Sequence, residues 1–129
     1  TPPLHLRDAP GLPEPGQDAG PLVAALLAPV RSGLVLTRRD LARAAASLGL
    51  GLRMGERAFA LRAMLGQDPR ATLAWLAEEA ASWSARHRRD QAALGDIGRH
   101  WRQRAEATHA LLRRLEGTTK EVTAHAAGR

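Results

Sequence analysis

The most regular alternation of apolar and polar residues lies between Asp68 and Glu116. Its first half has core-type positions separated by 3, 4, 3 and 4 residues: Leu73, Leu76, Ala80, Trp83 and His87. This spacing places all five on one face of an α-helix. The second half predicts another helix, with one face made by Ile97, Trp101, Ala105, Thr108, Leu112 and Leu115. Glycines at both ends of the segment between them predict a joint from Gly95 to Gly98.

Start and stop signals predict three shorter helices before this pair. Pro21 to Val30 is a short apolar segment, closed by Pro29 and the dipeptide Ser32-Gly33. Thr37 to Leu48 begins with TRRD, which approximates a capping box with Asp in place of Glu or Gln, and Gly49 follows its end.

The third short helix and the start of the long pair have equally clear boundaries. Glu56 to Leu65 is predicted to end at Gly66. Asp68 then has the side chain of an N-cap, and Pro69 suits the first helical position because its missing N–H has no partner there.

The two ends of the chain differ from this helical body. Residues 1–20 contain five prolines, which remove backbone donors and favour an extended arm. Residues 117–129 predict a flexible C-terminal tail. We therefore expect an all-α protein: one domain over residues 21–116, built as an irregular antiparallel bundle of about five helices, with an extended Pro-rich N-terminal arm.

Composition narrows the classes of protein. The 129 residues include no cysteine, which excludes disulfides and thiolate metal sites and fits a reducing, cytoplasmic location. No apolar run approaches the roughly 20 residues of a membrane span, and the N-terminus lacks the features of a secretory signal. The net charge of +6 favours an acidic partner, although arginine and alanine richness is also what GC-rich coding produces.

Most of the candidate contact charge lies around the predicted joint between the two long helices. The arginines there are Arg86, Arg88, Arg89, Arg99, Arg102 and Arg104. Guanidinium groups bind phosphate in a fork, and a neighbouring tryptophan can stack on an unpaired base. The pattern predicts nucleic-acid or acidic-partner binding; its alternative is the solvated rim of a bundle.

Two other segments are richer in apolar residues than a small core requires. The first is Pro21 to Leu36 and the second is the outer side of the helix that contains Trp75. A helix that is apolar on several sides is either central or covered by a partner. The residues predicted to bind a protein are Leu26, Val30, Leu34 and Trp75.

No spacing of chemically active residues indicates an enzyme. Glu106 and His109 have the E-x-x-H spacing of di-iron bundles, but the chain has no second such pair. Asp96 and His100 lie four residues apart and could share a metal on one helix face, but a solvated helix surface explains them more simply. Common nucleophile, P-loop and zinc motifs are absent. We expect no catalytic residue, no metal site and no cofactor.

The segment that follows Thr37 partly matches two motifs, one for DNA binding and one for phosphate binding. A helix-turn-helix would use Arg53, Arg57 and Arg62 as contacts, but Gly51 and Gly55 fall where its second helix should be rigid. The glycines of GLGLRMG superficially match a phosphate loop. Such a loop follows a strand, whereas here a helix precedes it, so connector glycines are the better interpretation.

The helical pattern of the chain resembles that of TorD-type chaperones over two runs, VRSGLVLTRRDLARAAASLGLGLRMGERAFALRAML and WLAEEAASW. This resemblance covers about half of the chain. It implies an all-helical protein that binds redox-enzyme precursors and their leader peptides. The acidic–proline–aspartate–histidine signature of that family is absent, so the resemblance assigns no site residue.

Together these patterns predict a non-enzymatic protein-interaction module: an adaptor, a chaperone-like protein or a subunit of a larger assembly. The alternative is a nucleic-acid-binding protein that contacts the phosphates of DNA or RNA through the arginine-rich joint. The sequence does not indicate an oligomeric state.

Overall fold

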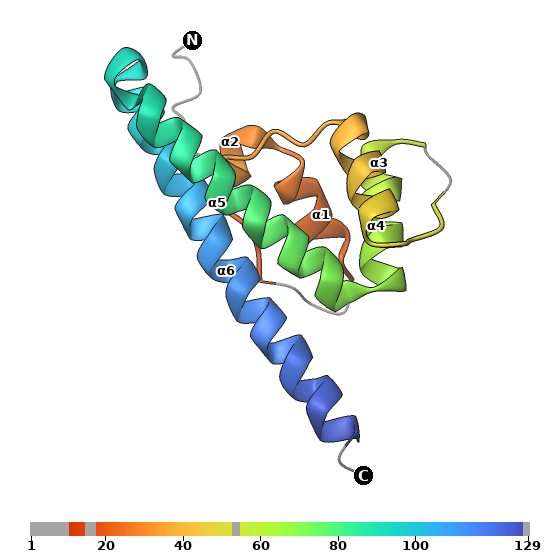
Figure 1. Ribbon diagram of the computed structural model, residues 1–129. Coiled ribbons are helices and arrows are strands. Elements are labelled where there is room, and N and C mark those ends of the chain that lie inside the picture. Colours follow the sequence, from red (N-terminus) through yellow and green to blue (C-terminus); the bar gives the residue numbers. More distant parts are fainter. Residues whose placement is uncertain (1–10, 15–17, 53–54, 128–129) are drawn as a thin grey trace.

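The computed structural model describes residues 11–14, 18–52 and 55–127, with side chains through residue 118. These residues form helices and no strand, so the all-α prediction is confirmed (Figure 1). In chain order the helices are α1 (Gly20–Leu26), α2 (Pro29–Ser32), α3 (Arg38–Ser47), α4 (Arg57–Gln67), α5 (Pro69–Leu94) and α6 (Asp96–Ala127).

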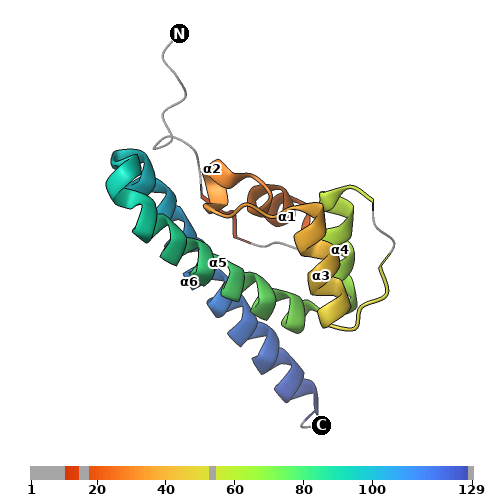
Figure 2. The same cartoon turned by 45° about the horizontal axis from the view of Figure 1, so that its top comes forward.

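The two long helices, α5 and α6, form an antiparallel hairpin. The four shorter helices lie on one side of it, and one end of the hairpin projects past α2 (Figures 1 and 2). The predicted start of α5 is confirmed, because Asp68 Oδ1 accepts a hydrogen bond from the backbone N–H of Ala71 at 3.1 Å and Pro69 opens the helix. Local capping chemistry therefore fixes the base of the hairpin.

The joint between α5 and α6 is shorter than predicted. Only Gly95, at φ 62°, separates the two helices, and Gly98 already belongs to α6. A Cβ atom at Gly98 would lie 2.9 Å from Leu94 Cβ and 3.0 Å from Gln91 Cα. Gly98 is thus a close-packing position, where the absent side chain lets the two helices approach, and the predicted joint over Gly95 to Gly98 is wrong.

The predicted end of the last helix at Glu116 is also wrong, because α6 continues through Gly117 to Ala127. One interior glycine costs a helix only about 1 kcal/mol, and no proline follows it in the sequence. The Thr118 hydroxyl adds a hydrogen bond to the carbonyl of Arg114 at 3.1 Å. In the same way, α4 continues through Gly66 and ends at Gln67 instead.

The capping box predicted for α3 is confirmed. Thr37 Oγ1 accepts from the backbone N–H of Asp40 at 3.1 Å, and Asp40 Oδ2 accepts from the N–H of Thr37 at 2.9 Å. The segment predicted from Pro21 to Val30 divides instead into α1 and the one-turn α2, since Pro29 cannot continue the first helix.

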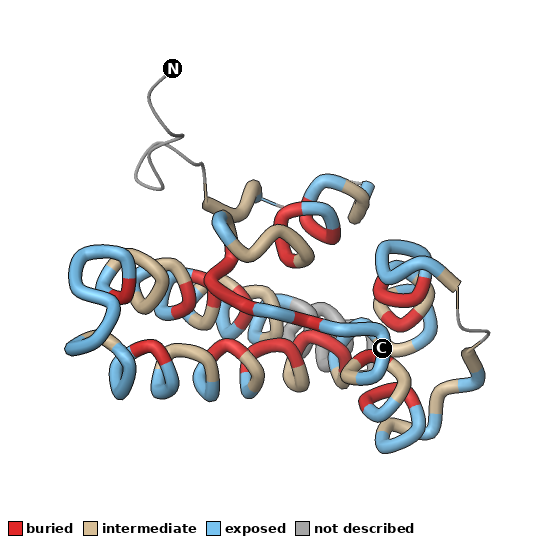
Figure 3. The backbone as a smooth tube through the Cα atoms, turned by 90° about the horizontal axis from the view of Figure 1, so that it is seen from above, coloured by how far each residue is buried: buried red, intermediate tan, exposed pale blue. Residues whose placement is uncertain are grey.

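The core fills the space between the hairpin and the shorter helices. Figure 3 shows buried residues along the sides of α5 and α6 that face the rest of the chain. Large side chains from every helix except α2 are fully buried there, including Leu26, Leu41, Leu61, Leu76 and Leu112. Each such side chain contributes roughly 1.5–3 kcal/mol, so burial of these leucines is the main force that joins the layers.

The turn after α2 makes the closest contact with the hairpin. Gly33 has φ 75°, and a Cβ atom there would lie 2.5 Å from the backbone N of Ala105 and 2.7 Å from the carbonyl O of Trp101. The Thr108 hydroxyl donates to the Ser32 carbonyl at 2.7 Å, and the Nε2–H of His87 donates to the Gly33 carbonyl at 2.7 Å. Both bonds are buried, so they fix the position of α2 on both long helices.

We expect Gly33→Ala to lower the free energy of unfolding by more than about 3 kcal/mol, because the left-handed conformation costs roughly 1–2 kcal/mol and α6 must also move. Gly49→Ala is the matched control: Gly49 has φ 71°, but nothing lies within 4 Å of its Cβ position. It should cost only about 1–2 kcal/mol. Urea unfolding of both variants measures the difference, and equal losses would contradict the steric role of Gly33.

Candidate protein-interaction surface

The six arginines predicted as one cluster lie on several surfaces of the hairpin. Arg88 and Arg102 lie 3.4 and 3.7 Å from Glu106 Oε1, and Arg99 pairs with Asp96. The guanidinium of Arg86 lies 4.6 Å from the ring centroid of Trp83. Arg104 lines a separate groove next to Arg31 and Arg114. The arginines therefore act together through their summed charge and do not form a single pocket.

That summed charge is concentrated on residues 84–106, which we call the hairpin end. This segment contains six arginines and three acidic residues, a net charge of +3. Arg89 is exposed, and no carboxylate of the described residues lies within ion-pair distance of it. The hairpin end thus has a positive field that extends about 10 Å at 0.1 M salt.

Two exposed apolar residues lie at the free end of the same segment. Leu94, the last residue of α5, is 48% exposed, and Ile97, in the first turn of α6, is 54% exposed. The sequence pattern placed Ile97 on a core face and did not single out Leu94. The signal for Leu94 was weak: it follows His87 by seven residues and so lies on the same face of α5, but polar Asp90 and Gln91 occupy the positions of that face between them.

The residues predicted to bind a protein have different positions. Leu26 and Leu34 are completely buried, so their assignment to a contact surface is corrected: both belong to the hydrophobic core. Val30 is 39% exposed and remains a candidate. Trp75 is half-buried and lines a cleft between α3 and α5 with Asp40, Arg43, Ser47 and Glu79.

The aromatic residues of the hairpin end pack against one another. The His87 ring lies between those of Trp83 and Trp101, with centroid distances of 5.5 and 5.7 Å. His87 is buried, as the sequence predicted, and both tryptophans are half-buried. Much of each indole is therefore occupied by packing inside the protein.

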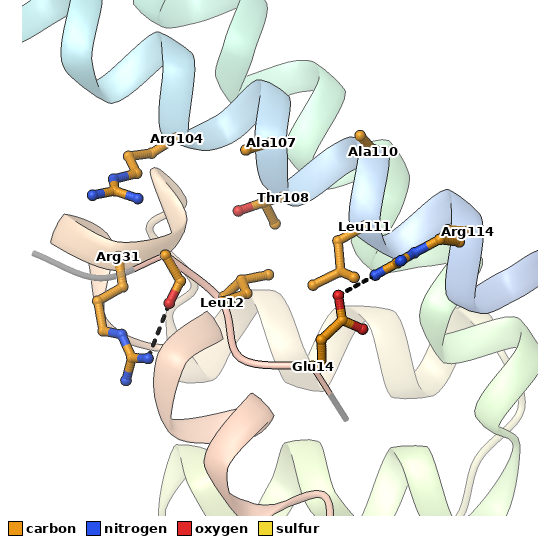
Figure 4. Close-up of a pocket in the computed structure, with 10 residues that line it drawn as sticks. Leu12, Glu14, Arg31, Arg104, Ala107, Thr108, Ala110, Leu111 and Arg114 are labelled. Carbon is orange, nitrogen blue, oxygen red and sulfur yellow. Dashed lines mark hydrogen bonds and ion pairs between the residues drawn. The ribbon is translucent and has the colours of Figure 1, made fainter. Parts of the chain in front are cut away.

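A second hollow, of about 430 Å³, lies between residues 11–14 and α6. Figure 4 shows Arg31 bonded to a backbone carbonyl, which is that of Gly11 (2.9 Å), and Glu14 paired with Arg114. Leu12 packs against the core. Part of the predicted N-terminal arm thus lies on α6, while residues 1–10 and 15–17 are outside the described residues. No local pattern of the sequence predicts this groove, because the paired residues lie up to 100 positions apart.

The predicted E-x-x-H pair, Glu106 and His109, lines a hollow between α5 and α6. Ser84, Arg88, Glu106 and His109 line it, and Ser84 Oγ lies 3.5 Å from Glu106 Oε1. No hydrogen bond of the described residues joins Ser84 to His109, and no three His, Asp or Glu side chains in that part of the chain gather as metal ligands do. Glu106 is engaged by two arginines instead.

The helix-turn-helix interpretation is not supported by the geometry of α3 and α4. Residues 48–56 separate these helices, whereas the motif has a turn of about 3–4 residues. Arg57 donates to the Leu36 carbonyl at 2.7 Å, and Arg62 lies 3.8 Å from Asp18. Arg53 lies outside the described residues.

Comparisons of this chain with models of protein families, with curated proteins and with solved structures found no match. The resemblance to TorD-type chaperones therefore stays a sequence-based expectation. A search of the described residues for a helix long and apolar enough to cross a membrane also found none.

The cleft beside Trp75 gives a pH-dependent prediction. Burial, together with the negative charges of Asp40 and Glu78, raises the pKa of Glu79 above its ordinary value of 4.5, although Arg86 acts in the opposite direction. The folded state therefore binds this proton more tightly than the unfolded state. The stability that results is present below the ordinary pKa and is lost as the pH rises through the raised pKa.

We expect Glu79→Gln, which imitates the neutral acid, to raise the free energy of unfolding at neutral pH. The gain should disappear as the pH falls toward about 4, where the wild-type carboxyl is protonated as well. Urea unfolding across this range measures it, with Glu56→Gln as the control because Glu56 is exposed and forms no ion pair among the described residues. A gain that is independent of pH would contradict the prediction.

Proposed function

We propose that this protein is a non-enzymatic interaction module that binds an acidic protein through its hairpin end. The observation that carries the proposal is the coincidence of two features there: exposed Leu94 and Ile97, and a net charge of +3. Apolar side chains supply affinity when they lose water, and complementary charge raises the association rate and selects the partner. An adaptor, a chaperone-like protein or an assembly subunit would use such a surface, and we place this activity in the cytoplasm.

The apolar residues favour a protein over a nucleic acid as the partner. Binding of single-stranded nucleic acid without sequence preference relies on phosphate contacts and on aromatic faces that stack with bases. Trp83 and Trp101 instead pack on either side of His87. Leu94 and Ile97 offer no stacking surface, whereas a protein partner would bury both of them.

Two variants of the chain that carries the crosslinker separate these alternatives. Ile97→Ser removes an apolar contact without changing position 94, and Arg86→Gln with Arg89→Gln removes charge that no ion pair of the described residues neutralises. For a protein partner, each should reduce recovery about tenfold, the effect of about 1.4 kcal/mol. A photo-crosslinking residue at position 94 of the full chain in source cells, followed by nuclease treatment and mass spectrometry, measures this recovery.

The control for the crosslink is the same residue at Ala92, which is exposed on the opposite face of α5 two positions earlier. It should capture no partner. Circular dichroism confirms that each variant is folded. The proposal is overturned if the apolar variant retains the captured protein as well as the wild type does. Binding to labelled DNA or RNA that depends on the arginines alone would instead establish the nucleic-acid alternative.

A further inference from the structure

We infer that the groove between residues 11–14 and α6 is a second binding site, which takes an extended acidic segment of a partner protein. We call it the α6 groove. Residues 11–14 of this chain occupy part of it and compete with that segment. Its centre lies at residues 107–114 of α6, apart from the hairpin end, so this site goes beyond the proposed function.

The sequence of α6 explains why this face of the helix is hollow. Arg104, Leu111 and Arg114 lie seven and three residues apart, so they follow one face of the helix. The exposed positions of that face between the two arginines are Ala107 and Ala110, whose side chains are small. The space above them has a volume of about 430 Å³, within the range of roughly 300–1,000 Å³ that is usual for ligand sites.

The part of the arm that lies in the groove shows which groups the groove recognises. Arg31 donates to the Gly11 carbonyl at 2.9 Å, a contact that does not depend on the side chain of the bound segment. Leu12 packs against the core, and the Glu14 carboxylate pairs with Arg114 (Figure 4). In an extended segment, residues two positions apart point to the same side. The groove therefore fits the pattern apolar–x–acid.

These contacts allow a competing segment to replace the arm. The side chains of Glu14 and Arg114 are 74% and 59% exposed, and exposed ion pairs contribute little to stability. Residues 11–13 are only half-buried, and the first buried residue of the described part of the chain is Leu22 in α1. Displacement of the arm therefore leaves the hydrophobic core intact.

The occupied groove also has room for a larger side chain than the one it holds. The hollow of about 430 Å³ remains with residues 11–14 in place. An aromatic ring at the position of Leu12 would fill more of this space and bury more apolar surface than leucine does. A partner segment with an aromatic residue two positions before its acid should thus bind more tightly than the sequence of the arm itself.

A segment of another protein is a better occupant than the arm of a second copy of this chain. The second copy offers the same sequence as the attached arm, which competes at an effective concentration on the order of millimolar. Two chains of net charge +6 also repel each other. An acidic partner is attracted instead, and its sequence is free to fill the groove more completely.

Fluorescence anisotropy with labelled peptides and the purified full chain tests this inference. The probe is the peptide APGFPEPG, which has the sequence of residues 9–16 with phenylalanine in place of leucine. One control peptide replaces the phenylalanine by serine, and a second replaces the glutamate by lysine. Amide chemical shifts of the chain locate the contact, and circular dichroism confirms that each variant of the chain is folded.

The probe should bind at least about tenfold more tightly than the serine peptide, because the serine buries almost no apolar surface. Glu14→Lys in the chain breaks the ion pair of the arm, so the fraction of molecules with an open groove rises. The probe should then bind about threefold more tightly than it binds the wild type. Shifts should centre on Ala107, Leu111 and Arg114 and spare Ile97.

A charge reversal in the groove tests the recognition of the acid. Arg114→Glu should reverse the preference of the chain, so that the lysine peptide binds more tightly than the probe. Arg113→Glu is the matched control: it changes the net charge equally, but Arg113 pairs with Glu116 and does not line the groove. It should leave the preference for the probe unchanged.

The inference is overturned if Glu14→Lys does not raise the affinity for the probe, if Arg114→Glu leaves the preference as it was, or if the shifts centre on another surface. Dimers that form as the concentration of the wild type rises, and that Glu14→Lys abolishes, would assign the groove to a second copy of the chain and overturn it as well. None of these results involves Leu94 or Ile97, so the proposed function of the hairpin end is tested separately.

Discussion

The contact between Gly33 and the long hairpin fixes how the two layers of this protein fit together. A backbone turn approaches α6 so closely that no side chain fits, and its two neighbouring carbonyls accept buried hydrogen bonds from Thr108 and His87. Any shift of α2 along the hairpin would break both bonds, and each buried group left unpaired costs about 1–3 kcal/mol. Hydrophobic burial joins the layers, but these directional bonds determine their relative position.

In that position the shorter helices α1 to α4 cover only part of the length of the hairpin. The faces that pack Leu76 and Leu112 in the core extend to Leu94 and Ile97, where no helix of the described residues covers them. Single exposed apolar residues are common on protein surfaces. Here two of them lie in register with the core stripes of adjacent helices and inside the most arginine-rich segment, and this combination distinguishes the hairpin end from an ordinary surface.

Electrostatics at the hairpin end act at two ranges. At contact distance, Glu106 and Asp96 partly neutralise Arg88, Arg102 and Arg99, and exposed pairs of this kind contribute only about 0–1 kcal/mol to stability. At longer range the excess positive charge remains. The arginines therefore do little to hold the fold together, and their main physical consequence is the field that a partner meets as it approaches.

The sequence by itself determined the features that depend on neighbouring residues. Thr37 with Asp40, and Asp68 with Pro69, fix helix starts within a single turn, and the spacing of Leu73, Leu76 and Ala80 fixes the core face of α5. Only the tertiary structure decided which apolar residues remain exposed, because Leu26 and Leu34 are covered by elements distant in the chain, whereas Leu94 and Ile97 lie beyond them. It likewise separated arginines that are adjacent in sequence, since successive positions of a helix point about 100° apart and meet different neighbours.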